Sequence, residues 1–143
     1  MADCIFCQIV KKEIPAYLVY EDNDFLAFLD IRPLNPGHTL VIPKKHYRWV
    51  WDVKNIGQYY QVVAKIAHAL RKVFQTDYIV SLVFGEEVPH AHVWLIPRLP
   101  NDGHGGAIDL NNVKKIPEKE MKQIALKINT SLKDFNFGDN SSV

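Results

Sequence analysis

Short runs of β-branched and aromatic residues, bounded by Asp, Asn, Gly or Pro, recur along the chain and predict β-strands. These runs lie at residues 17–20, 25–29, 38–42, 78–84 and 91–96. The first two are separated by only the four polar residues 21–24, a spacing typical of a hairpin. Apolar residues recur at helical spacing over 56–74 and again from Pro117 to Leu132, which predicts two main helices. Asp52 is the expected cap of the first helix.

This order of elements indicates an α+β fold with a mostly antiparallel five-stranded sheet and helices on one of its faces. There is no internal repeat, and composition does not change as it would at a linker. We therefore expect a single domain over residues 1–137, followed by a polar, flexible tail over 138–143.

Composition narrows the functional classes. The chain has 143 residues, 48% of them hydrophobic, which suffices for one core. Its 17 basic and 16 acidic residues nearly cancel, so no broad positive field favours nucleic acid. The N-terminus lacks the pattern of a secretory signal, and no apolar run is long enough to cross a bilayer. We expect a cytoplasmic protein that binds neither nucleic acid nor membrane.

The most informative segment is Pro-His-Ala-His-Val-Trp-Leu-Ile-Pro, residues 89–97. The two-residue period of a strand places His90, His92 and Trp94 on one face and the intervening apolar residues on the other. Two imidazoles on a shared face suggest a functional site. The alternative is a pair of half-buried structural histidines.

Cys4 and Cys7 stand three positions apart, as half of a tetrahedral zinc site often does. Two other interpretations remain open, a buried pair of reduced thiols and a redox pair. The redox interpretation lacks the βαβ context that such motifs normally have.

The chain resembles the histidine-triad superfamily over most of its length. The matching blocks are residues 3–7, 13–16, 19–22, 28–33, 36–46, His90-Ala91-His92 and 96–98. The resemblance implies a HIT-like fold, a two-fold homodimer and a nucleotide hydrolase or nucleotidyl transferase. It also implies that His92 attacks the α-phosphorus of a phosphoramidate, a dinucleoside polyphosphate or a related conjugate. Zinc-containing members further imply a structural zinc ion on Cys4, Cys7, His46 and His90.

The resemblance also implies where a purine nucleoside phosphate would bind. Asp30 matches the carboxylate that accepts hydrogen bonds from ribose hydroxyls. The remaining residues expected at the nucleotide are Phe6, Phe28, Leu29, Ile31, Gly85, Glu87, Val88 and Trp94. At the turn that contains Gly85 we expect the backbone N–H groups to meet the phosphates and the side chains of Glu86 and Glu87 to point away.

Trp94 occupies the position of the third histidine of the superfamily signature. An indole N–H only donates and does not titrate, so Trp94 cannot act as an acid. A non-catalytic purine-nucleotide-binding regulatory module is therefore the main alternative to an enzyme, and a zinc-dependent redox or nucleic-acid module is a third. We expect the glycine-rich loop 101–106 to be flexible, and Arg98 and His104 to be solvated.

Overall fold

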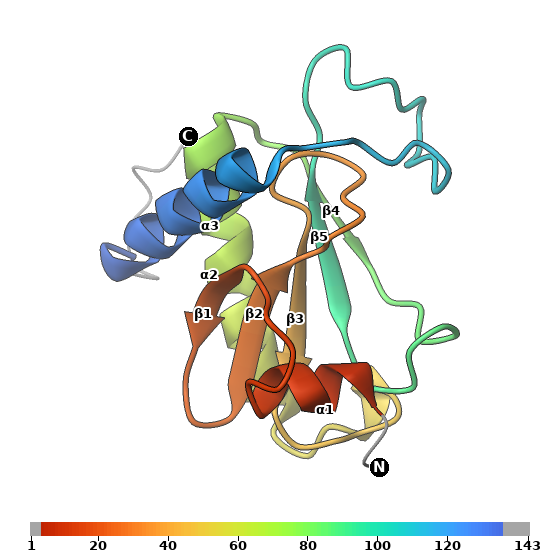
Figure 1. The fold of residues 1–143 in the computed structure, drawn as a ribbon, viewed down its shortest axis with the longest axis vertical. Helices are drawn as coiled ribbons and strands as arrows, with labels where there is room; N and C mark the ends of the chain where they lie inside the picture. Colours follow the sequence, from red (N-terminus) through yellow and green to blue (C-terminus); the bar gives the residue numbers. More distant parts are fainter. Residues whose placement is uncertain (1–3, 136–143) are drawn as a thin grey trace.

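The computed structural model describes residues 4–135, so the expected boundary at residue 137 and the tail 138–143 lie outside the described residues. The order of elements confirms an α+β architecture (Figure 1). The helices are α1 (Ile5–Val10), the 3-10 helix η1 (Val50–Asp52), α2 (Ile56–Phe74) and α3 (Glu118–Lys133). The strands are β1 (Leu18–Glu21), β2 (Phe25–Leu29), β3 (Thr39–Pro43), β4 (Ile79–Leu82) and β5 (Val93–Pro97).

All five predicted strands are present, in one antiparallel sheet with the order β1-β2-β3-β5-β4. The expected hairpin joins β1 to β2, and Asp22 closes it by accepting hydrogen bonds from the backbone N–H groups of Asp24 and Phe25, both at 2.8 Å. Two strands are shorter than expected. β4 ends at Leu82 and β5 begins at Val93, because the chain between them leaves the sheet for a long turn.

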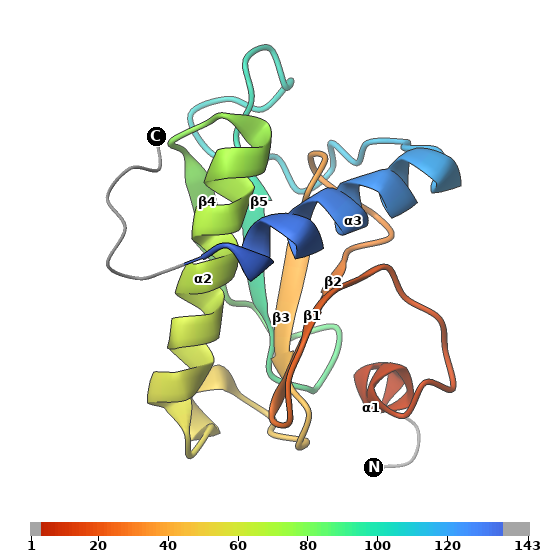
Figure 2. The same cartoon turned by 90° about the vertical axis from the view of Figure 1, so that its left-hand side faces the viewer.

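The sheet is covered on both faces. Along β2, Phe25, Ala27 and Leu29 belong to the core under α2 and α3, whereas Leu26 and Phe28 belong to a second core under α1. Figure 2 shows α1 and α2 on opposite sides of the sheet. The expectation of helices on one face therefore holds for α2 and α3, but it is wrong for α1, a short helix that periodicity did not predict.

Helix α2 begins later than expected. Its N-cap is Asn55, which makes no side-chain capping hydrogen bond, while Asp52 lies in η1. The helix is tied to the sheet by Tyr59, whose buried hydroxyl donates to the carbonyl oxygen of Val41 at 2.6 Å. Within residues 4–135, no helix combines the length and the apolar character needed to cross a bilayer.

The loop after β5 is held in place rather than free. Arg98 donates from Nε to Asp102 Oδ2 at 2.9 Å, and Asp102 also accepts from Asn35 Nδ2 at 2.9 Å. His104 Nε2 lies 2.8 Å from the carbonyl oxygen of Leu34. Our expectations of a flexible loop and of solvated Arg98 and His104 are wrong, because Arg98 pairs with the buried carboxylate of Asp102 and the His104 ring is hydrogen-bonded to backbone groups.

Candidate functional site

The histidine segment enters the sheet in extended form. His90 and His92 precede β5, and the alternation expected from the sequence is confirmed: Ala91 and Val93 are in the core under α2 and α3, while Trp94 packs against the core under α1. Both imidazole rings contact Phe6 of α1, with ring centroids 5.9 Å away for His90 and 5.2 Å for His92. The two histidines therefore share the α1 face of the sheet.

His92 is held in one orientation by its own segment. Nδ1 lies 2.7 Å from the carbonyl oxygen of His90. A carbonyl oxygen only accepts, so Nδ1 carries the proton and Nε2 keeps a free lone pair. Nε2 makes no hydrogen bond within the described part of the chain, yet it is not fully buried. The residue as a whole is 6% exposed, and burial lowers the pKa of the imidazole. The result is a neutral ring with an accessible nucleophilic nitrogen.

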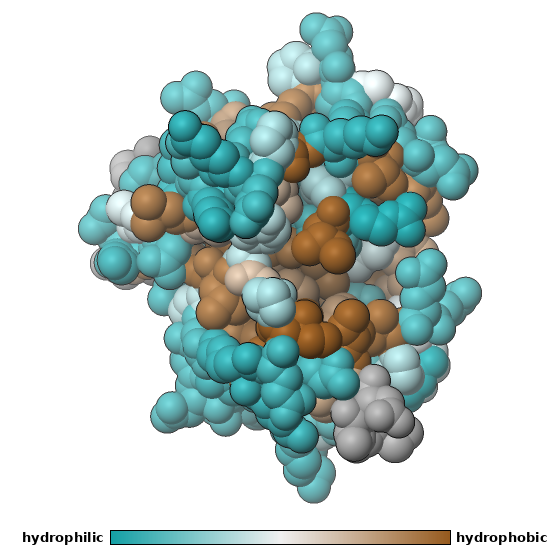
Figure 3. Space-filling view, viewed as in Figure 1, coloured by the Kyte–Doolittle hydropathy of each residue, from teal (hydrophilic) through white to brown (hydrophobic). Residues whose placement is uncertain are grey.

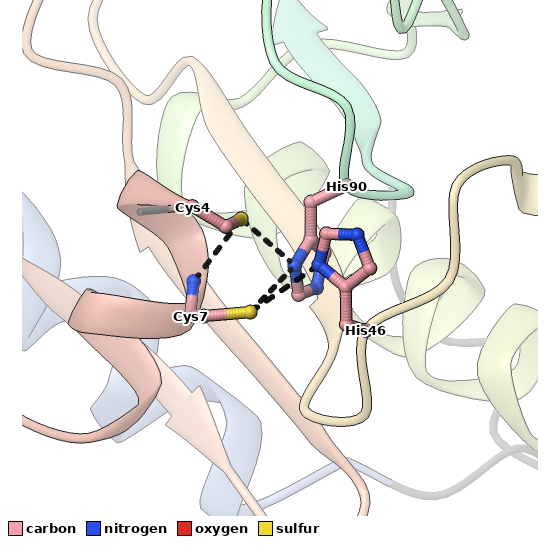
Figure 4. Close-up of side chains that lie close together, drawn as sticks. All are labelled: Cys4, Cys7, His46 and His90. Carbon is pink, nitrogen blue, oxygen red and sulfur yellow. Dashed lines mark hydrogen bonds between the residues drawn. The ribbon is translucent and has the colours of Figure 1, made fainter. Parts of the chain in front are cut away.

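Four potential metal ligands converge beside this histidine (Figure 4). Cys4 is the N-cap of α1, Cys7 lies in its first turn, His46 follows β3, and His90 precedes β5. Cys7 Sγ lies 3.3 Å from His46 Nδ1 and 3.5 Å from His90 Nδ1, and Cys4 Sγ lies 3.4 Å from His90 Nδ1. All four ligand atoms fall within 4.8 Å of one another.

The chemistry and the spacing of this cluster fit zinc. A tetrahedral ion with Zn–S near 2.3 Å and Zn–N near 2.0 Å has ligand–ligand edges of about 3.3–3.8 Å. The three sulfur–nitrogen distances fall in or next to that range. His90 Nε2 lies 2.8 Å from the carbonyl oxygen of Pro43, so its proton is on Nε2 and its Nδ1 lone pair faces the sulfurs. The donor set of two thiols and two imidazole nitrogens is therefore suited to hold the ion, and it leaves no open coordination position.

Asp30 lies directly after β2, on the same side as His92. Its Oδ1 accepts from the backbone N–H of Arg32 at 2.8 Å, and burial raises the pKa of the carboxyl group. Its Oδ2 lies 3.6 Å from Nε2 of His38, a residue whose role the sequence reasoning missed. His38 Nδ1 accepts from the backbone N–H of Leu34 at 3.1 Å, so its proton is on Nε2 and faces the carboxylate. Burial lowers the pKa of His38 to about 3, and the ring is neutral.

Trp94 lies between two other rings. Its indole is 4.7 Å from the ring of His38 and 5.2 Å from that of Phe84, and its Nε1 is buried without a hydrogen-bond partner. The side chain is half-buried in the second core. Its observed role is therefore packing beside the site.

The other expected nucleotide-binding residues are divided between the two faces. Phe6 and Phe28 pack edge to face at 5.5 Å on the α1 side, and Ile31 is 76% exposed. The expectation that Leu29 lies at the nucleotide is corrected for its side chain, which is 1% exposed and lies in the core under α2 and α3. Neighbours on a strand point to opposite faces, so Leu29 faces away from Phe28. Figure 3 shows the α1 face of the molecule, where apolar side chains gather around a hollowed centre.

The turn before the histidines contains Gly85, whose φ of +103° favours glycine. A Cβ at this position would lie 2.8 Å from the ring of Trp49. Contact with Trp49 therefore accounts for the glycine, and the close approach of a ligand stays a prediction. Glu87 is exposed and Val88 is half-buried against the second core.

Comparison with known proteins gives consistent matches. A model of the HIT domain matches residues 11–101. A HIT-like protein of Borreliella burgdorferi is 39% identical over 92% of this chain and 100% of its own length. An adenosine 5'-monophosphoramidase of Schizosaccharomyces pombe is 33% identical over 91% of this chain and 98% of its own. The structure of a zinc-bound histidine triad family protein from Mycobacterium smegmatis has a TM-score of 0.73 and 29% identity, covering 92% of this chain and 94% of that one.

Proposed function

This chain belongs to the HIT domain family, and on that premise we propose that it is a nucleotide hydrolase or nucleotidyl transferase that forms a covalent intermediate on His92. Its substrates would be nucleoside phosphoramidates, dinucleoside polyphosphates or related conjugates. The similarity to an adenosine 5'-monophosphoramidase supports this substrate class. The observation that carries the proposal is the 2.7 Å contact between His92 Nδ1 and the His90 carbonyl, which leaves Nε2 as the reactive atom.

In the first step, the Nε2 lone pair of His92 attacks the α-phosphorus and forms a P–N bond. The bond from phosphorus to the leaving group breaks, and the leaving group departs with that electron pair and takes up a proton from solvent. The proton on Nδ1 remains hydrogen-bonded to the His90 carbonyl, which stabilises the positive charge that develops on the ring. In the second step, water attacks phosphorus and gives up a proton to solvent, the P–N bond breaks with its electron pair returning to Nε2, and the nucleoside monophosphate leaves the neutral imidazole.

The nucleotide is proposed to lie on the α1 face. Asp30 would accept hydrogen bonds from the ribose hydroxyls, since the backbone N–H of Arg32 holds its carboxylate in place. Phe6, Phe28 and the exposed Ile31 would line the base. The phosphates would meet the backbone of the turn from Gly85 to Val88.

Cys4, Cys7, His46 and His90 are proposed to hold a structural zinc ion. The bound ion would fasten α1 to the sheet and would not act as a Lewis acid, because four protein ligands complete its coordination. By the same resemblance, we propose a homodimer located in the cytoplasm.

A purine-nucleotide-binding regulatory protein is the second candidate. The observation that favours it is Trp94, which stands where the resemblance places the third histidine. Its indole N–H does not ionise near neutral pH and so supplies no proton to a leaving group, and it is buried without a partner. Such a protein would bind the same ligand but form no adduct.

The test compares the wild type with His92→Asn on adenosine 5'-phosphoramidate and a diadenosine polyphosphate, with release of adenosine monophosphate as the readout. His68→Asn, on α2 at the opposite face, is the matched control and should retain full activity. We expect His92→Asn to lose at least about 100-fold in rate and to show no nucleotidyl mass after a rapid quench, whereas the wild type shows one. Equal rates for wild type and His92→Asn would exclude the histidine mechanism. Nucleotide binding without turnover or adduct in the wild type would favour the regulatory protein.

A further inference from the structure

Arg48 is half-buried, and one nitrogen of its guanidinium is buried without a hydrogen-bond partner. Its Nη1 atom is fully buried and makes no hydrogen bond within residues 4–135. The five ion pairs of this part of the chain do not include it. The carbon at the centre of the guanidinium lies 3.8 Å from the ring centroid of Trp49, so the group is stacked on an indole. The position is well defined, but the charge is not neutralised by the protein.

The unpaired nitrogen lies at the phosphate end of the proposed site. A Cβ added to Gly85 would be 3.4 Å from Arg48 Nη1 and 2.8 Å from Trp49, so the three residues are direct neighbours. Gly85 belongs to the turn that leads to His92. The backbone N–H of Ala91, next to His92, donates to the carbonyl oxygen of Tyr47, next to Arg48, at 2.7 Å, so the two segments lie side by side.

An unsatisfied buried donor is unfavourable, and a charged one more so. Native proteins retain such groups mainly where a ligand, an ion or water completes the hydrogen bonds. The exposed Glu86 and Glu87 do not fill this role, because neither forms an ion pair with Arg48 within residues 4–135. A guanidinium held flat against an aromatic ring is suited to bind phosphate oxygens, with the stack keeping its N–H groups aimed.

We propose that Arg48 binds the substrate phosphate that His92 attacks, with Nη1 donating to a non-bridging oxygen and Trp49 holding the guanidinium in place. This role rests on the proposed function, because it requires a nucleotide phosphate beside His92. It gives the site a fixed positive charge where the equatorial oxygens of the transition state accumulate negative charge. It also gives a purpose to the glycine at position 85, since any side chain there would occupy the space beside the guanidinium.

The experiment measures the binding of adenosine monophosphate and of adenosine by calorimetry, using the full-length zinc-loaded protein. The variants are Arg48→Met, which removes the charge, and Arg48→Lys, which keeps the charge but lacks the planar guanidinium with its paired N–H donors. Arg71→Met is the matched control, since Arg71 at the end of α2 also has a buried nitrogen without a hydrogen bond, Nε, but its charge is paired with the exposed Asp77. Thermal unfolding and zinc content are measured for every protein.

We expect Arg48→Met to weaken binding of adenosine monophosphate on the order of 10- to 100-fold while adenosine binding stays unchanged. Arg48→Lys should recover part of the loss, and Arg71→Met should bind as the wild type does. Because Nη1 makes no hydrogen bond in the free protein and a methionine can still pack on Trp49, Arg48→Met should leave the unfolding temperature near that of the wild type. A lower unfolding temperature with equal losses for both ligands would assign Arg48 a structural role and overturn the proposal.

The outcomes separate this inference from the proposed function. If the wild type turns over nucleotide and Arg48→Met binds adenosine monophosphate as tightly as the wild type, only the role of Arg48 is overturned. If the wild type binds no adenosine monophosphate, both proposals fail together.

Discussion

Replacing Asp102 with asparagine should destabilise the protein substantially, although Asp102 lies in a loop. The side chain is 4% exposed, and its Oδ2 accepts hydrogen bonds from Arg98 Nε, the backbone N–H of Leu99 and Asn35 Nδ2. Oδ1 accepts from Arg98 Nη2 and the backbone N–H of His104. An asparagine amide keeps at most one of these oxygens and turns an NH2 group toward at least two donors.

The magnitude follows from these contacts. Hydrogen bonds to a charged group contribute about 1.5–3 kcal/mol each, and breaking a buried ion pair costs about 3–5 kcal/mol. Arg98 is 22% exposed and water can partly replace the lost carboxylate, which reduces the cost. We therefore expect Asp102→Asn to lower the free energy of unfolding by about 2–4 kcal/mol.

The hydrogen bonds from Arg98 hold the pKa of Asp102 well below its ordinary value. A depressed carboxyl pKa stabilises the folded protein above the unfolded value, about 3.9, and this contribution is lost as the pH falls further. The difference between wild type and Asp102→Asn should be constant from pH 8 to about pH 5 and should shrink below about pH 4.

The measurement is urea unfolding followed by tryptophan fluorescence, at fixed zinc concentration and at several pH values. Asp77→Asn is the control, because Asp77 also pairs with an arginine but is 57% exposed, and its replacement should cost under about 1 kcal/mol. Equal losses for the two variants, or a difference that persists unchanged at pH 3, would refute the reasoning.

Three further predictions concern the site and its supports. Cys4→Ser should reduce bound zinc below one ion per chain and lower the unfolding temperature, measured by metal analysis and calorimetry. Through His38, the wild type should lose about 2 kcal/mol of its free energy of unfolding between pH 7 and pH 5. The pKa of His38 is about 3 in the folded protein and about 6.5 in the unfolded chain, so only the unfolded chain binds the proton in this range. His38→Gln should reduce this dependence of stability on pH, measured by urea unfolding. Gly85→Ala should cost about 1–3 kcal/mol in urea unfolding because of its positive φ and the Trp49 ring, while Gly105→Ala, where a Cβ meets nothing within 4 Å, should be nearly neutral.

The strands were predictable because each is a short β-branched or aromatic run that needs little beyond its own pattern to be recognised. Helix α1 was not, since its six residues are too few to show a period. Its geometry depends on partners distant in sequence, including the contact between Cys4 and His90, 86 positions apart. The start of α2 was misplaced because Asp52 caps well in isolation, but the chain uses it in η1.

The candidate site was predictable where residue type and spacing carry the chemistry. Cys4 and Cys7, and the alternation of His90 and His92, could be read along the chain, and family resemblance added His46. Arg48 and His38 could not, because an arginine after a lysine pair or a histidine in an apolar strand is usually unremarkable. Their significance depends on how deeply they are buried and on whether their nitrogens have hydrogen-bond partners, which only the folded chain reveals.

A single residue joins the proposed metal site to the proposed nucleophile. His90 directs Nδ1 to the cysteines and Nε2 to the Pro43 carbonyl, while its own carbonyl fixes the ring of His92. In such an arrangement, loss of zinc would loosen both α1, which carries the base-lining Phe6, and the segment that orients the reactive imidazole. Turnover would then follow the supply of a trace element that never contacts the substrate.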